Sequence, residues 1–181
     1  NRATDHFVGE LSDALCDIHM STTIKKSGLT PLWTKQQVHG LFEALQERTD
    51  DAIKILLART GEEFITLARG ISTYKDRTGN LRSSTGYAIF KDGRRIGSSV
   101  FNAHVGEPGK KDGEKGVTTG EQLARVVGRT HSKGYVLVCF AGMSYAAAVE
   151  SRGYDVITHS ADKAEDFLMS EATNLLKRLN L

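Results

Sequence analysis

The chain has 181 residues, of which 39% are hydrophobic and 25% are charged, and its formal net charge is +2. This length and composition predict one soluble domain that can bury an adequate core. The near-neutral charge gives no reason to expect the whole surface to bind nucleic acid, and no apolar run is long enough to cross a bilayer. We expect Cys16 and Cys139 to be reduced core residues, with a disulfide between them as the alternative.

The first third of the chain is predicted to be helical. Residues 5–20 space their apolar side chains at intervals of three and four, which is typical of an amphipathic helix. Thr34 and Gln37 form a capping box that opens a second helical region, which could reach Arg69. Gly61 lies inside this region and is a point where the helix could kink or split.

The period of the pattern changes after residue 84. Short apolar runs flank Lys91-Asp92-Gly93-Arg94, and Asp-Gly is a strong signal for a hairpin turn. Residues 106–116 hold four glycines and three lysines, so we expect a flexible and exposed loop. Thr118 and Glu121 are predicted to cap a short helix after it.

The last third predicts a strand, a helix, a strand and a final helix. Residues 135–140 form an almost unbroken apolar run, which is typical of a central strand that is covered on both faces. A short helix over 144–152 and a last strand over 154–158 are expected to follow. Ser160 is predicted to cap the closing helix.

Together these elements predict an α+β fold with N-terminal helices, a small and mainly antiparallel sheet with a hairpin, and a C-terminal helix packed on the sheet. Residues 1–33 are predicted to form an N-terminal helix and linker. Residues 34–181 are predicted to form a single α+β domain, with an inserted flexible loop at about 103–133.

The patterns of enzyme chemistry are missing from the sequence. There is no phosphate-binding loop, no His-Glu-x-x-His and no Cys-x-x-Cys, and the six histidines are scattered one at a time. Glu150 could act as an acid or base, but an ion pair at a helix end is the simpler interpretation. We therefore expect no enzyme, no cofactor and no metal.

Basic residues give a weaker signal. Seven Lys or Arg lie between Arg69 and Arg95, against two Asp, and the following loop adds three lysines. Such a patch could face phosphates, while a solvated hairpin with ion pairs between subunits is the alternative. The candidate residues for subunit contacts or for lining a channel are Arg77, Arg82, Arg94, Arg95, Lys110, Lys111 and Lys115.

Thr78-Gly79-Asn80-Leu81 is predicted to be a structural joint between helix and sheet. Gly79 permits a positive φ, and Asn80 tolerates one. Leu81 would then fill the core, and Arg82 would emerge towards a carboxylate of a neighbouring subunit. The stretch therefore indicates a scaffold and no reaction centre.

The order of these segments resembles a bacteriophage family, the neck or tail-completion proteins of long-tailed phages related to the lambda minor tail protein Z type. The resemblance is carried by Ala68-Arg69, by Thr78-Gly79-Asn80-Leu81-Arg82-Ser83-Ser84 and by Tyr145-Ala146-Ala147-Ala148-Val149-Glu150-Ser151-Arg152-Gly153. It covers roughly residues 50–179. The segment from about 103 to 133 is longer than expected for the family, and one extra residue precedes Gly153.

This resemblance implies a structural virion protein that is assembled in the bacterial host cytoplasm. Copies would form a ring at the head–tail neck, with other neck, head-closure and tail proteins as partners, DNA in the lumen and no membrane. In that setting residues 106–117 would order only in the assembled particle. A tail terminator or a head-closure protein is a near alternative, and a small nucleic-acid-binding module that uses the hairpin and loop is a more distant one.

Overall fold

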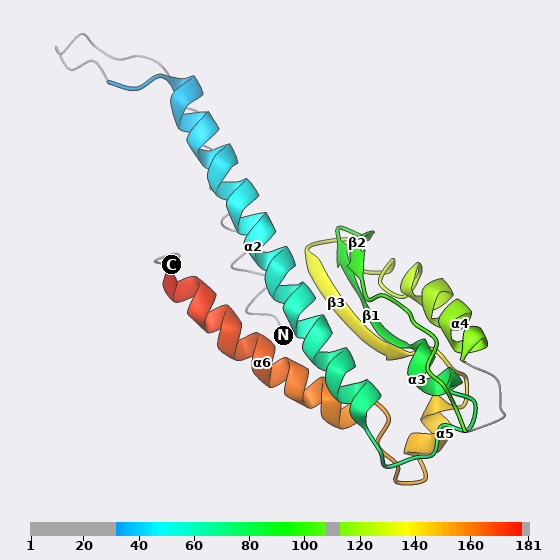
Figure 1. The fold of residues 1–181 in the computed structure, drawn as a ribbon. Helices are drawn as coiled ribbons and strands as arrows, with labels where there is room; N and C mark the ends of the chain where they lie inside the picture. Colours follow the sequence, from blue (N-terminus) through cyan, green and yellow to red (C-terminus); the bar gives the residue numbers. More distant parts are fainter. Residues whose placement is uncertain (1–31, 108–112, 179–181) are drawn as a thin grey trace. The chain divides into compact units, whose positions relative to one another are not determined.

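The computed structural model describes residues 32–107 and 113–178 (Figure 1). The chain divides into two compact units, Asn1–Phe42 and Glu43–Leu181, and the boundary falls within the long helix α2 (Lys35–Gly70). The helix predicted over residues 5–20 lies outside the described residues. No helix in the described ranges is both long and apolar enough to cross a membrane.

In the first unit, the structure describes the start of α2. Thr34 and Gln37 form the predicted capping box: the Thr34 amide donates to Gln37 Oε1 at 2.8 Å, and the Gln37 amide donates to Thr34 Oγ1 at 3.2 Å. These two bonds satisfy amides that have no partner within the first turn of a helix. The predicted start of this helix is confirmed.

The predicted end of α2 near Arg69 is also confirmed, and the split that Gly61 could have caused is absent, since α2 continues through it. The glycine at this position serves a packing contact instead. A Cβ atom on Gly61 would lie 2.5 Å from the ring of Tyr87, so only a glycine allows the tyrosine to approach this closely. The cost of glycine in a helix interior, about 1 kcal/mol, is offset by this contact.

The second unit is built on a three-stranded antiparallel sheet in the order β2-β1-β3. The central strand β1 (Thr85–Lys91) pairs with β2 (Arg94–Ser98) through the predicted hairpin, in which Asp92 and Gly93 have φ values of 51° and 74°. Two successive positive φ values match a turn of type I′. The hairpin prediction is confirmed.

The strand β3 (Tyr135–Ala141) lies at an edge of the sheet, which corrects the prediction of a central strand. Its apolar run has another cause, since both faces of the sheet are covered by helices. Tyr135, Leu137 and Cys139 pack towards one buried cluster, while Val138 and Phe140 belong to another. An apolar run in a strand therefore indicates that both faces of the strand are covered, and it does not indicate how many strands flank it.

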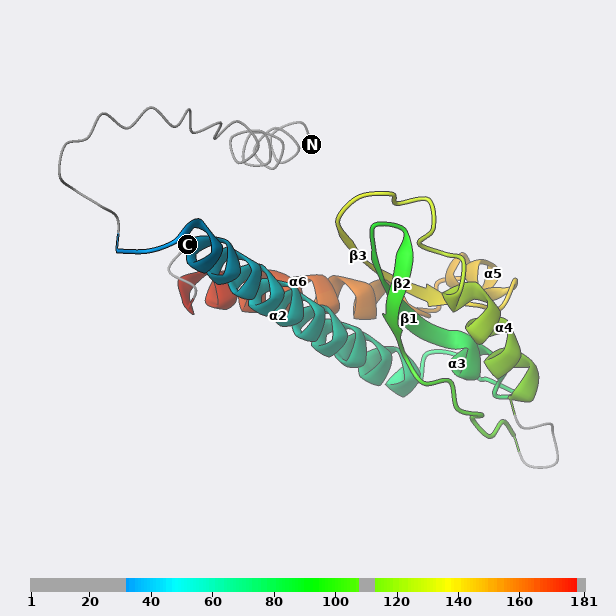
Figure 2. The same cartoon turned by 90° about the horizontal axis from the view of Figure 1, so that it is seen from above.

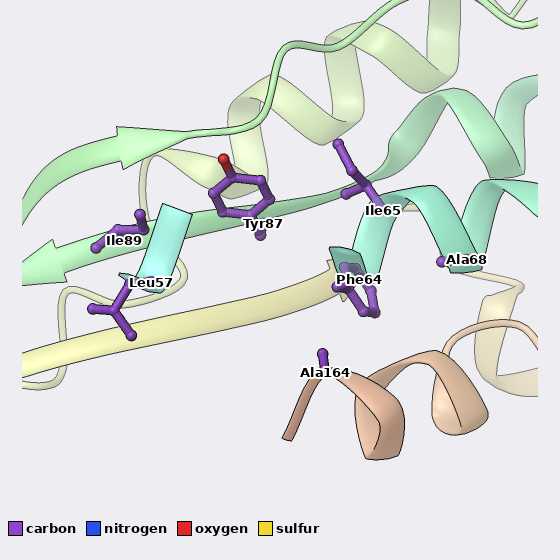
Figure 3. Close-up of a cluster of buried hydrophobic side chains, with 7 residues drawn as sticks. All are labelled: Leu57, Phe64, Ile65, Ala68, Tyr87, Ile89 and Ala164. Atoms are coloured by element: carbon purple, nitrogen blue, oxygen red, sulfur yellow. The ribbon is translucent and has the colours of Figure 1, made fainter. Parts of the chain in front are cut away.

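Helices lie on both sides of the sheet, α4 (Glu114–Ala124) on one and α2 with α6 (Thr158–Arg178) on the other (Figure 2). The α2 and α6 side holds the larger cluster (Figure 3), which consists of Leu57, Phe64, Ile65, Ala68, Tyr87, Ile89 and Ala164. The predicted α+β fold, with its C-terminal helix packed on the sheet, is confirmed.

The start of α4 differs from the prediction. The helix begins at Glu114, directly after Gly113, which has a φ of 67°, and Thr118 lies inside it with its hydroxyl donating to the Glu114 carbonyl at 3.1 Å. Residues 114–117 are therefore helical in the single chain. This contradicts the expectation that all of 106–117 orders only on assembly, whereas 108–112 lie outside the described residues.

The region before α6 also differs from the prediction. A short helix, α5 (Ala146–Glu150), is present as expected, but residues 154–158 form no strand. The helix α6 begins at Thr158, so Ser160 lies buried within its first turn and cannot cap it. The start of α6 is stabilised instead by a carboxylate from α5, described below.

Candidate functional site

The two stretches that carry the family resemblance meet in the structure. Residues 76–78 and Leu81 line a depression of about 370 Å³ together with Tyr145 and Val149, which come from the start of the second stretch. Beneath it, Leu81 packs with Tyr74 and other buried apolar side chains. The helix α3 (Asn80–Ser84) forms the turn from this depression into β1. We call the lining of this depression, together with α3, the joint.

The backbone at the joint requires a glycine. Gly79 has a φ of 71°, and a Cβ atom on it would lie 1.8 Å from the carbonyl oxygen of His104. Asn80 makes no use of its tolerance for a positive φ, because it is the first residue of α3. Its side chain instead accepts from the Gly116 amide at 3.0 Å and donates to Thr78 Oγ1 at 2.9 Å.

The joint also holds both flanks of the glycine-rich segment. The Glu107 amide donates to the Arg77 carbonyl at 2.9 Å, and the Gly113 amide donates to the Thr78 carbonyl at 3.0 Å. The two flanks thus attach to adjacent carbonyls. This arrangement explains why α4 starts at Glu114: the preceding residue is already fixed against the joint.

A serine connects the joint with the segment after β2. The Ser83 hydroxyl donates to the Gly79 carbonyl at 2.7 Å and accepts from the His104 amide at 2.8 Å. The side chain is completely buried, so these bonds replace those that water would make. One buried hydroxyl therefore holds the joint and the segment at His104 together.

Arg82 turns towards its own chain. Its Nη2 atom donates to the Ile71 carbonyl at 2.6 Å, and its guanidinium carbon lies 5.6 Å from the centre of the Tyr74 ring. The Arg82 amide donates to Asp76 Oδ2 at 2.8 Å. These contacts account for Arg82 within one subunit, whereas the sequence analysis expected it to emerge towards a neighbour.

The other predicted basic residues fall at two ends of β1. Arg77 is exposed at the joint and Lys115 is exposed nearby on α4, while Arg94 and Arg95 are exposed at the hairpin end (Figure 1). Lys110 and Lys111 lie outside the described residues. The structure therefore does not gather these side chains into one patch, and their roles in contacts stay predictions.

Sequence reasoning missed several polar groups of the joint. Arg69 Nη2 donates to the carbonyls of Thr85 and Val100, at 2.9 and 3.2 Å, and so ties the end of α2 to the sheet. Burial, and then the charges of Arg69 and Arg82, lower the pKa of His104. Arg69 belongs to the Ala68-Arg69 pair that carries the family resemblance, but no local sequence pattern predicts a role for Tyr74 or His104.

Four side-chain atoms near the joint are buried and make no hydrogen bond within the part of the chain that the structure describes. They are Arg69 Nε, Tyr74 Oη, Arg82 Nε and His104 Nε2. Burial also raises the pKa of Tyr74. Polar atoms thus lie buried beside the joint without a partner in the described residues, and burying a polar atom without a hydrogen bond costs free energy.

Glu150 acts at a helix end, as predicted, but it does so by accepting hydrogen bonds from backbone amides. Its Oε1 atom accepts from the amides of Val156, Ile157 and Thr158, at 3.3, 3.0 and 3.2 Å, and from the Thr158 hydroxyl at 3.0 Å. Burial opposes ionisation, but these bonds outweigh it and hold the pKa of Glu150 below its ordinary value. The carboxylate caps the start of α6 and is not an ion-pair partner in these contacts.

The remaining chemistry of the described residues is sparse. No group of three or more potential metal ligands occurs within residues 32–107 and 113–178. Burial raises the pKa of the Cys139 thiol to about 12, so it is protonated at neutral pH and is a poor nucleophile. The chain matches no protein-family model, no curated protein and no solved structure.

Proposed function

We propose that this chain is a structural virion protein, part of the neck ring that joins the DNA-filled head to the tail of a tailed phage. The observation that carries the proposal is the meeting of the two motif stretches at one joint, where residues 76–78 and Leu81 line the same depression as Tyr145 and Val149. The resemblance rests on these stretches, and their shared site explains why they would occur together. The role is that of a scaffold and needs no cofactor.

Exposed side chains at both ends of β1 support an assembly role. Arg94 and Arg95 are exposed at the hairpin end, while Val100 and Val105, on the segment that returns to the joint end, are 70% and 82% exposed. Exposed charged and large apolar side chains are suited to contacts with neighbouring chains. In a ring, each such surface meets a different surface of the next copy, so that the rotation between copies closes.

Electron microscopy of lysates from a phage with a null allele of this gene tests the proposal. The expected result is filled heads and finished tails that lie unjoined. Tails of abnormal length would indicate a tail terminator instead, and empty heads beside finished tails would indicate head closure. Normal and infectious particles would contradict every structural role in the virion.

A second candidate function is a small nucleic-acid-binding module, which the exposure of Arg94 and Arg95 favours. Binding of DNA by the isolated monomer, with an affinity that falls steeply as salt rises, would support it, because phosphate contacts release counterions. The ring proposal predicts weak binding until copies assemble. Fluorescence anisotropy with a short duplex at several salt concentrations separates the two.

A further inference from the structure

The two edges of the sheet are protected to different degrees. The edge strand β2 has five residues, carries Arg94 and Arg95, and its register with β1 shifts between Ile89 and Phe90. Short length, charged residues and such irregularities are devices that prevent a sheet edge from pairing with another chain. The edge strand β3 has seven residues, keeps an unbroken register with β1, and contains no charged residue and no proline.

The hydrogen bonds at the ends of the β1–β3 ladder show which backbone groups of β3 face outwards. The Gly142 amide donates to the Ser84 carbonyl, and the Asp92 amide donates to the Gly134 carbonyl. Antiparallel pairs alternate between bonded and non-bonded positions, so the even-numbered residues of β3 bond to β1. The outward N–H and C=O groups are those of the odd-numbered residues, Tyr135, Leu137, Cys139 and Ala141.

These outward groups have no partner within the described part of the chain. Apart from the ladder itself, the backbone of residues 135–141 makes no hydrogen bond there. The side chains from Tyr135 to Cys139 are only half-buried, although both faces of the strand adjoin apolar clusters. A strand added at this edge would therefore need to be uncharged and apolar on both faces.

We propose that the outer edge of β3 pairs with β3 of a second copy of this chain. β3 has the required composition, and an antiparallel pair centred on Val138 overlaps all seven residues. This register places Tyr135 opposite Ala141, and Leu137 opposite Cys139, so every outward group meets another outward group. The contact is two-fold and uses the same surface on both copies, so a ring contact would use other surfaces, and the inference does not rest on the proposed function.

Disulfide trapping tests this register in the full-length chain. In a Cys16→Ser, Cys139→Ala background, Val138→Cys would face its own counterpart at a non-hydrogen-bonded position, where Cα atoms lie about 4.5 Å apart. Mild oxidation is expected to convert most of the protein into a disulfide-linked dimer of twice 19.8 kDa. Val136→Cys is the matched control, since it lies on the same face but opposite Phe140, and it is expected to stay monomeric.

Three results of this experiment would overturn the proposal. One is the absence of a crosslinked dimer with Val138→Cys, and another is equal crosslinking with Val136→Cys. A third is efficient crosslinking between Val138→Cys on one copy and Ser98→Cys on the other, because it would show β3 pairing with β2 of the next copy.

A backbone variant gives an independent readout. Leu137→Pro removes an outward N–H without removing a bond of the β1–β3 ladder, and Leu137→Ala is its matched control, because it loses side-chain packing but keeps the amide. Sedimentation velocity is expected to show a dimer for Leu137→Ala and a monomer for Leu137→Pro, with the same helix content by circular dichroism. A folded Leu137→Pro protein that remains dimeric would overturn the proposal.

Discussion

The two ends of β1 differ in the freedom that they leave to the sequence. At the joint end, the segments that contain His104 and Gly113 both contact residues 78–80, and a single methyl group added to Gly79 would collide with the His104 carbonyl. At the hairpin end, Arg94 and Arg95 extend from an edge strand into solvent. Figure 1 shows these ends at opposite sides of the sheet, α3 at the one and the β1–β2 turn at the other.

This difference separates residues that hold the fold from residues that are available for contacts. Substitutions at the joint should change the free energy of unfolding, because packing and backbone geometry there leave no room for adjustment. Substitutions of the exposed Arg94 and Arg95 at the hairpin end should leave stability nearly unchanged and affect only interactions with other chains.

The largest effect is expected for Gly79→Ala. The positive φ and the collision with a backbone carbonyl add strain and overpacking, so the free energy of unfolding should fall by about 4 kcal/mol. Gly153→Ala is the control: its φ is 84°, but no atom lies near the added methyl group, and a loss of about 1 kcal/mol is expected. Urea denaturation measures both, and equal losses would show that the joint is not crowded.

Leu81→Ala is expected to have the next largest effect. Leu81 is 2% exposed, and truncating such a side chain leaves a cavity that costs about 3 kcal/mol. Leu176→Ala removes the same atoms from a position on α6 that is 51% exposed, so a loss below about 0.5 kcal/mol is expected. Chemical denaturation of both variants should separate them clearly. A cost for Leu81→Ala no larger than for Leu176→Ala would mean that the joint is not part of the core.

Glu150→Gln should have a smaller effect that depends on pH. Because hydrogen bonds lower the pKa of the folded-state carboxyl, its stabilisation is complete above the ordinary glutamate value of 4.5 and is lost as the pH falls through the lower folded value. At pH 7 the substitution should cost about 0.5–1 kcal/mol, after allowing for solvent screening. The difference from the wild type should shrink as the pH falls below 4.5, and a difference that grows on acidification would contradict the cap.

Local patterns predicted those parts of the fold whose contacts lie within a few residues of each other. The capping box of Thr34 and Gln37, the Asp92-Gly93 turn and the positive φ of Gly79 all follow from short-range geometry. The burial of Leu81 followed from its place between a helix and a strand. These features could be read directly from neighbouring residue types.

Contacts between distant residues account for the errors. The place of β3 at an edge depends on the number of strands, which an apolar run does not encode. The cap of α6 comes from Glu150, eight residues before Thr158, so Ser160 gave a false signal. Arg82 was expected to face outwards because its acceptor, the Ile71 carbonyl, lies eleven residues earlier. No spacing rule predicts such pairs.

Complementation of the null phage with a double variant, Arg94→Glu with Arg95→Glu, tests the central claim most directly. Both side chains are exposed, so the free energy of unfolding of the purified variant should lie within about 0.5 kcal/mol of the wild-type value. The account predicts that this folded protein fails to restore infectivity and leaves heads and tails unjoined, because the charges at the hairpin end serve contacts in the particle. Wild-type titres with joined particles would contradict it.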